Sequence, residues 1–251
     1  MISAERRRSE VRELVGLALR ESSRAAGGVH RTHRGVSDRV FGAVGLFVGG
    51  SALPVKVIHD AITDGVYRTV QSTAAIAAAV GERVADLPLA APPSETPLGA
   101  GAIGAVAGLI GDDLAARRSV LVEEGVSVRV DGVSVAPEDV AAAYPGATGS
   151  IVVLAHGLMG TEHTFAFGEG PHYDEVLGTH GFTPLFVRYN TGRRISVNGL
   201  ALASLIGELV ERWPVPVERI VLIGHSMGGL VLRSALHHAE QADASWVSGV
   251  A

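Results

Sequence analysis

The second half of the chain alternates strand-like and helix-like hydrophobic patterns. Residues 126–130 and 133–135 alternate apolar and polar side chains on either side of Asp131-Gly132, which predicts an antiparallel hairpin. Three nearly continuous Val/Ile/Leu runs follow at 151–155, 184–189 and 220–223, and such runs are typical of strands buried on both faces. Helical patterns at 200–212 and 230–239 alternate with them. The order predicts an α/β fold, a mostly parallel sheet with an antiparallel edge hairpin.

The first half has a different pattern. Val11, Leu14, Val15 and Leu19 recur at helical spacing, and an alanine-rich stretch at 55–84 continues in the same way. A proline-rich segment at 90–97 indicates a connector, and the apolar helix predicted at 98–118 is so rich in small residues that it suits close packing. We therefore expect a helical annex at 1–90, a connector and packing helix at 91–118, and the N-terminal portion of an α/β domain at 119–251.

Composition limits the partners and the compartment. The net charge of −5 argues against nucleic acid, and the absence of cysteine excludes disulfides, thiolate metal sites and a cysteine nucleophile. The arginines at 6–8 are not followed by the apolar run of a signal peptide, and the apolar run at 40–55 is broken by glycines and a proline. That run favours a buried or interface helix over a membrane span. Since no signal peptide is evident, we expect a cytoplasmic protein. Its 47% of hydrophobic residues make a peripheral membrane contact an alternative to a fully soluble state.

The segment around Ser226 carries the chemistry. A predicted buried strand leads into Gly224-His225-Ser226-Met227-Gly228 and then into a helix, which is the sequence pattern of a nucleophile elbow. Glycine is needed at 224 and 228 because a Cβ there would strike neighbouring backbone in so sharp a turn. The alternative, a glycine-rich phosphate-binding turn, lacks the lysine that a P-loop requires. We predict that Ser226 is an acyl-transfer nucleophile, with His225 packed within the elbow.

A second segment supports the first. The predicted strand at 151–155 ends in His156-Gly157-Leu158, about 70 residues before the serine. An oxyanion hole takes one N–H from the residue after the nucleophile and one from the loop after an earlier strand, so Met227 and Leu158 fill these roles. His156 is a candidate base, but a structural role suits it better, because the base follows the nucleophile in this chain order.

Two loops complete the candidate pocket. Asn190 and Arg193 follow the strand at 184–189, at the sheet edge where ligands bind in open α/β folds. They either orient substrate or cap the next helix. His163, His172 and Asp174 lie in a glycine-rich stretch whose spacing is not that of a metal site, so we expect a mobile lid or a pocket rim there, and no metal or other cofactor.

These motifs resemble those of a known family. The runs 156–163, 188–192, 196–199 and 224–229 are similar to lipase-like α/β-hydrolases of actinobacterial type, related to the PGAP1-like inositol deacylases. The resemblance covers roughly residues 90–251, and the helical first third is similar to an annex of the bacterial members. It implies ester hydrolysis by a Ser-Asp-His triad without a cofactor, acting on lipid or short acyl esters.

One part of that pattern is missing. After Ser226 the sequence given has only His237, His238, Glu240 and Asp243 as candidate partners, and the two histidines lie on the helix that leaves the elbow. At about 1.5 Å per residue, His237 is roughly 16 Å along the axis from Ser226. We therefore expect an α/β-hydrolase fold that is incomplete at its C-terminus and a chain that is inactive alone. The alternatives are a truncated, inactive homologue that binds lipid or a partner, and an acyltransferase or thioesterase with the same nucleophile.

Overall fold

A computed structural model describes residues 2–21, 38, 91–166 and 171–251. The chain forms two compact units, Met1–Pro93 and Ser94–Ala251. In the first unit, helix α1 spans Ile2–Glu21 and includes the predicted positions Val11, Leu14, Val15 and Leu19. The rest of the predicted annex, with the apolar run at 40–55 and the alanine-rich stretch at 55–84, lies outside the described residues.

The second unit is built on a five-stranded mixed sheet in the order β2-β1-β4-β3-β5. Strands β1 (Val126–Val130) and β2 (Val133–Val135) form the predicted hairpin, and positive φ angles at Asp131 (51°) and Gly132 (80°) make its two-residue turn. β1 also pairs antiparallel with β4 (Thr183–Tyr189), while β3 (Ser150–Ala155) pairs parallel with β4 and with β5 (Arg219–Gly224). The predicted α/β fold with an antiparallel edge hairpin is confirmed.

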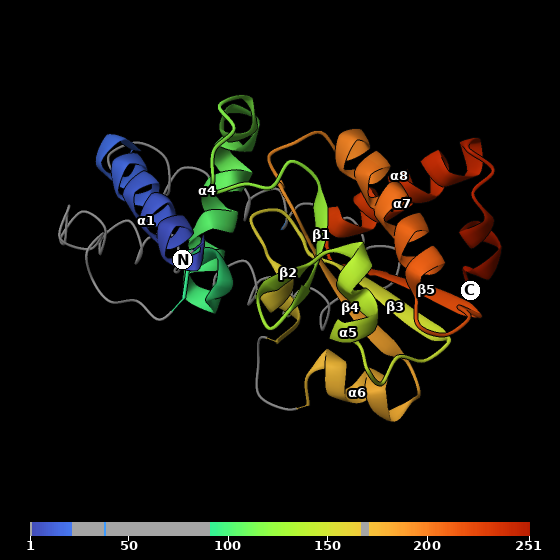
Figure 1. Cartoon of the computed structure of the whole chain (residues 1–251). Helices are drawn as coiled ribbons and strands as arrows, with labels where there is room; N and C mark the ends of the chain where they lie inside the picture. Colours follow the sequence, from blue (N-terminus) through green and yellow to red (C-terminus); the bar gives the residue numbers. More distant parts are fainter. Residues whose placement is uncertain (1, 22–37, 39–90, 167–170) are drawn as a thin grey trace. The chain divides into compact units, whose positions relative to one another are not determined.

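Helices cover both faces of this sheet (Figure 1). Helices α7 (Ile195–Arg212) and α8 (Met227–Gln241) pack together on one face, and α6 (Tyr173–Thr179) packs against β4 on the other. The α7–α8 side holds the larger core, and the α6 side holds a smaller one centred on Val152, Leu154 and Phe165. Helix α5 and four 3-10 helices complete the unit: η3 Pro93–Glu95, η4 Pro137–Asp139, α5 Val140–Ala143, η5 Glu162–Ala166 and η6 Ser245–Gly249.

Burial differs among the three parallel strands. β3 is buried at every position from Ile151 to Ala155, as its continuous apolar run predicts for a central strand. β4 instead alternates buried and half-buried positions. The face of the sheet on which α6 packs is only partly covered, because α6 is a short helix. β5 is half-buried at Val221, Leu222 and Ile223, where it forms the outer edge of the named strands. The prediction of full burial therefore holds for β3 and is wrong for β4 and β5.

The predicted small-residue helix is α4 (Pro97–Ala116), which begins at an N-cap where the Gly99 N–H donates to Thr96 Oγ1. Its backbone is non-helical at Ile110, so the helix is kinked there. Among the described residues α4 alone is long and apolar enough to cross a membrane, and 44% of its apolar window is buried within the structure. Length and composition of this kind are shared by core helices of proteins that never enter a membrane.

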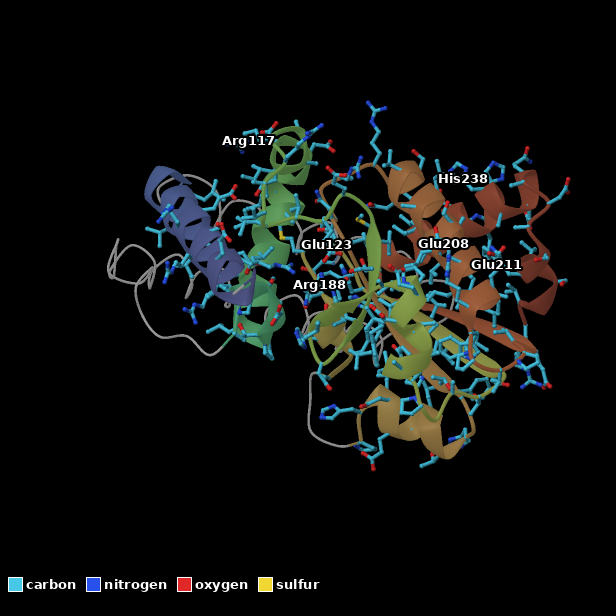
Figure 2. The ribbon with its side chains drawn as sticks, viewed as in Figure 1. Arg117, Glu123, Arg188, Glu208, Glu211 and His238 are labelled. Atoms are coloured by element: carbon cyan, nitrogen blue, oxygen red, sulfur yellow. The ribbon has the colours of Figure 1, made fainter. Side chains whose placement is uncertain are left out.

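A buried ion pair connects β4 to the loop after β3. Arg188 binds the Glu162 carboxylate through both Nε, at 2.6 Å from Oε2, and Nη2, and its Nη1 donates to the Ser94 carbonyl. Both side chains are nearly buried, at 11% and 7% exposed. Burial raises the pKa of Glu162, but the hydrogen bonds and charge of Arg188 outweigh it, so the net pKa is lowered. A second pair joins Arg129 of β1 to Glu123, which precedes the strand (Figure 2 labels Glu123 and Arg188).

Replacing Arg188 with methionine should lower the free energy of unfolding of the second unit by about 3–5 kcal/mol, because it leaves the Glu162 carboxylate buried without its partner. Urea unfolding followed by tryptophan fluorescence measures this, since both tryptophans, Trp213 and Trp246, lie in this unit. The exposed Arg212→Met is the matched control and should change stability by no more than about 0.5 kcal/mol. The double variant with Glu162→Gln should lose less than Arg188→Met alone, and an equal loss would contradict the role of the buried charge.

Candidate active site

Ser226 lies in a sharp turn between β5 and α8. Its backbone has φ 52° and ψ −119°, a combination that a residue with a side chain rarely adopts and that costs about 1–3 kcal/mol. The His225 N–H donates to the Ala155 carbonyl at 2.9 Å, and the Gly228 and Gly229 N–H groups close the turn onto the carbonyls of His225 and Ser226. The side chain of Ser226 is exposed at the N-terminus of α8.

The glycines of the elbow are required by backbone packing. A Cβ on Gly224 would lie 2.4 Å from the Gly229 nitrogen, and one on Gly228 would lie 2.1 Å from the Ala155 carbonyl oxygen. Neither obstacle is a flexible side chain, so no substituted residue fits without moving β3 or α8. This close approach lets α8 start directly behind the serine, and the strand-turn-helix arrangement predicted for this segment is confirmed.

The loop after β3 lies against the elbow. A Cβ on Gly157 would lie 3.1 Å from Ser226 Cβ and 2.8 Å from His225 Nδ1, so this backbone touches the serine turn. Gly157 to Gly160 form a tight turn in which the Gly160 N–H donates to the Gly157 carbonyl at 3.0 Å. Among the hydrogen bonds of the described residues, the backbone N–H groups of Leu158 and Met227 appear with no acceptor. Within the described residues, two donors without an acceptor therefore lie on the two turns that meet at Ser226.

His156 is fully buried at the end of β3. Its ring stacks on Tyr189 with centroids 4.4 Å apart, and its Nδ1 lies 3.0 Å from the Gly157 carbonyl. The Tyr189 hydroxyl donates to the backbone carbonyl of His156. Since a carbonyl only accepts, Nδ1 carries the hydrogen and the neutral ring has its lone pair on Nε2. Burial lowers the pKa of His156 to about 4. A neutral ring held by Tyr189 suits the structural role that we favoured for this residue.

Asn190 and Arg193 occupy the loop between β4 and α7. The buried Asn190 side chain donates to the Gly111 carbonyl of α4 and accepts from the Gly192 N–H, at 2.9 and 3.0 Å. Arg193 Nη1 donates to the Glu124 carbonyl at 2.5 Å. Both side chains thus bind protein backbone. The sequence did not indicate a role for Thr191, which lies between them. Its Oγ1 accepts a hydrogen bond from the Met159 N–H at 3.1 Å. A threonine among polar loop residues gives no sequence signal of such a contact.

The stretch after the Gly157 turn is more regular than the sequence indicates. His163 lies in η5 with Nε2 3.4 Å from Glu162 Oε1, and Asp174 lies in the first turn of α6, of which His172 is the N-cap. The prediction of one glycine-rich loop for these residues is therefore wrong, and residues 167–170 lie outside the described part. No cluster of three metal-ligating side chains occurs among the described residues.

The later histidines belong to another surface. His237 and His238 lie on α8, and His238 lines a groove of about 300 Å³ between α7, α8 and η6, together with Glu211 and Trp246. Figure 2 labels Glu208, Glu211 and His238 on these helices. No predicted site residue lines this groove. The groove is thus separate from the serine turn.

A strained serine between a parallel strand and a helix, beside the loop of the neighbouring strand, defines an α/β-hydrolase fold. The family model described as "Putative serine esterase (DUF676)" matches residues 148–250, somewhat less than half of the chain. The match includes β3, β4, β5 and every residue predicted for the site. No curated protein and no solved structure matches the chain. The chain is thus similar to esterase-type serine hydrolases over the segment that holds Ser226.

His156 should make the second unit sensitive to acid between pH 6.5 and about 4. Because its pKa is lowered in the folded state, the unfolded chain binds the proton first, so stability is complete above pH 6.5 and is lost as the pH falls toward 4, by about 3 kcal/mol at most. Urea unfolding across this range should show a shallower pH dependence for His156→Phe, which keeps a ring against Tyr189. The pKa of His163 is also lowered, first by burial, so part of the slope should remain. His180→Gln, at an exposed position, is the control; a His156→Phe slope equal to that of this control would contradict the assignment.

Proposed function

We propose that this protein is a serine carboxylic-ester hydrolase of esterase or lipase type, acting through an acyl-enzyme on Ser226. The observation that carries the proposal is the strained Ser226, exposed at the N-terminus of α8 and flanked by the uncommitted N–H groups of Leu158 and Met227. This arrangement gives a nucleophile and two donors for the negative charge that develops on a carbonyl oxygen. The match to serine esterases over 148–250 supports the same chemistry.

In the proposed reaction Ser226 Oγ bonds to the ester carbonyl carbon, and the carbonyl oxygen takes the negative charge between the Leu158 and Met227 N–H groups. The carbonyl re-forms as the C–O bond to the alcohol breaks, and the alcohol leaves with the proton that the Ser226 hydroxyl gave up. Water then attacks the acyl-enzyme, the bond between Oγ and the acyl carbon breaks, and one water proton returns to Oγ as the carboxylic acid leaves. The positive end of the α8 dipole favours the charged species at both steps.

The acyl group that this surface suits is apolar. Leu158 and Leu230 are 36% and 54% exposed, and Leu230 stands one helical turn after Ser226 on α8. Because helical side chains lean toward the N-terminus, Leu230 covers surface on the serine side of its own position. These exposed side chains support an acyl chain of lipid type and a peripheral membrane contact. A relation to inositol deacylases and a cytoplasmic location stay predictions from the sequence.

One observation favours a second candidate function. In the part of the chain that the structure describes, His156 is held by Tyr189 and by the Gly157 carbonyl, and His237 and His238 lie farther along α8. An oxyanion hole without a base retains only weak catalysis. The alternative is therefore an inactive homologue that uses the same apolar surface to bind lipid.

Labelling with a fluorophosphonate probe tests whether Ser226 is a nucleophile. In the reaction a bond forms between Oγ and phosphorus, fluoride leaves, and the hydroxyl proton passes to solvent. We expect the protein, in a form that also supplies the acid and the base, to be labelled at Ser226, and Ser226→Ala to lose both labelling and ester turnover in that form. Ser204→Ala, an exposed serine on α7, is the matched control and should keep both. An unlabelled wild-type chain that still binds phospholipid vesicles would support the inactive homologue and overturn the esterase proposal.

Replacing Leu230 with asparagine tests the apolar acyl group. We expect kcat/KM for a long-chain p-nitrophenyl ester to fall about tenfold, the equivalent of about 1.4 kcal/mol of lost apolar contact, while the acetate ester changes little. Val133→Asn, an exposed valine on β2, should leave both values unchanged. Equal losses for the two esters would argue against acyl contact at Leu230.

A further inference from the structure

The loop that carries the Leu158 N–H contains a second strained residue. Met159 has φ 61°, a left-handed backbone conformation that is costly for residues other than glycine and asparagine. The residue is 3% exposed. Such a conformation persists only where the surroundings over-determine it. The contacts of Met159 therefore show what fixes the loop.

One contact is a buried hydrogen bond. The Met159 N–H donates to Thr191 Oγ1 at 3.1 Å, and Thr191 is 3% exposed. This bond holds the peptide group that follows Leu158, in the middle of the turn closed by the Gly160 N–H on the Gly157 carbonyl. Without the threonine hydroxyl the Met159 N–H would be buried and unpaired, which costs about 1–3 kcal/mol.

The other contacts come from α4, through a glycine face formed by Gly104, Gly108 and Gly111. A Cβ on Gly104 would lie 2.9 Å from the Gly160 carbonyl oxygen, and one on Gly108 would lie 3.2 Å from both Met159 N and Cα. The helix backbone thus lies directly on the loop backbone. At the third position, the Gly111 carbonyl accepts from Asn190 Nδ2 at 2.9 Å. The loop that holds Thr191 is therefore fixed to the same helix.

Asn190 also anchors its own loop to α7. Its carbonyl accepts from Asn198 Nδ2 at 2.9 Å, and its Oδ1 accepts from the Gly192 N–H. A continuous series of contacts consequently runs from α4 through Asn190 and Thr191 to Met159, while the glycine face contacts the same turn directly.

We propose that Thr191 and the glycine face of α4 are positioning residues that hold the Leu158 N–H in place for the oxyanion. This inference rests on the proposed esterase function. It gives the glycine face of α4 and the β4–α7 loop a positioning role, although none of these residues need touch the substrate. Asn190 is then a positioning residue too, through the backbone groups that it binds.

The first test replaces Thr191 with valine, which keeps the shape and removes the acceptor. We expect kcat for a short ester and the rate of fluorophosphonate labelling to fall about 10- to 100-fold, with KM nearly unchanged, because the interaction lost acts on the transition state. A trifluoromethyl ketone inhibitor, which forms an oxyanion, should lose affinity by a similar factor. Thr191→Ser retains the hydroxyl and should restore all three values.

The second test displaces the loop from the helix side. Gly104→Ala places a methyl against the Gly160 carbonyl and should reduce the labelling rate and the inhibitor affinity in the same way. Leu109→Ala, at an exposed position of the same helix, is the matched control and should leave them unchanged. Tryptophan fluorescence in urea confirms that each variant is folded before its rates are compared.

The outcomes of these tests distinguish a failure of the positioning role from a failure of the proposed esterase function. If the wild-type chain is not labelled at Ser226, the esterase proposal fails. If the wild-type chain is labelled and folded Thr191→Val and Gly104→Ala react at its rate, the positioning role is overturned while the esterase proposal stands. A fall in Thr191→Val that Thr191→Ser does not restore would also overturn the role of the hydroxyl.

Discussion

The approach of α8 to the end of β3 is the contact on which the rest of the site depends. Gly228 lies so close to the Ala155 carbonyl that even one Cβ would reach within 2.1 Å of its oxygen. The register that pairs Ala155 with Gly224 brings the ends of β3 and β5 level, and the His225 N–H then bonds to the same Ala155 carbonyl. The serine turn and the Gly157 turn consequently start side by side. A residue with a side chain at Gly224 or Gly228 would separate the proposed nucleophile from the proposed oxyanion donors.

Backbone dipoles, more than side-chain charges, supply the electrostatics at Ser226. Burial keeps His156 neutral, and the guanidinium of Arg188 is neutralised by its bidentate bond to Glu162. Close to the serine lie the His225 ring, the N-terminus of α8 and the Leu158 and Met227 N–H groups, which have no acceptor among the described residues. Such donors stabilise charge only where they are already oriented, and in the proposed site the strained backbone at Ser226 and Met159 supplies that orientation. The buried core around β3 offsets that strain.

The sequence predicted those features that arise from local patterns. The Asp131-Gly132 hairpin, the order of strands and helices, and the glycines of the serine turn all follow from periodicity and from the conformations that glycine alone permits. Contacts between distant segments carried no such signal. The hydrogen bond from Met159 to Thr191 and the Arg188–Glu162 pair depend on how loops meet at the sheet edge, and the uneven burial of β4 depends on the shortness of α6. The sequence therefore located the proposed nucleophile but not the residues that fix its surroundings.

Helix α4 shows how composition can be read in two ways. Its alanine, leucine, isoleucine and valine residues give it the hydropathy of a membrane span, yet its glycines let its backbone lie against Gly160 and Met159. Large apolar side chains would preserve the hydropathy and prevent that contact. The segment similar to serine esterases begins at residue 148, after α4 and the hairpin, whereas the compact unit begins at Ser94. If the oxyanion loop needs the glycine face to keep Met159 strained, the smallest functional unit is the compact one, and a fragment limited to the matched residues would keep the nucleophile without the support that orients its donors.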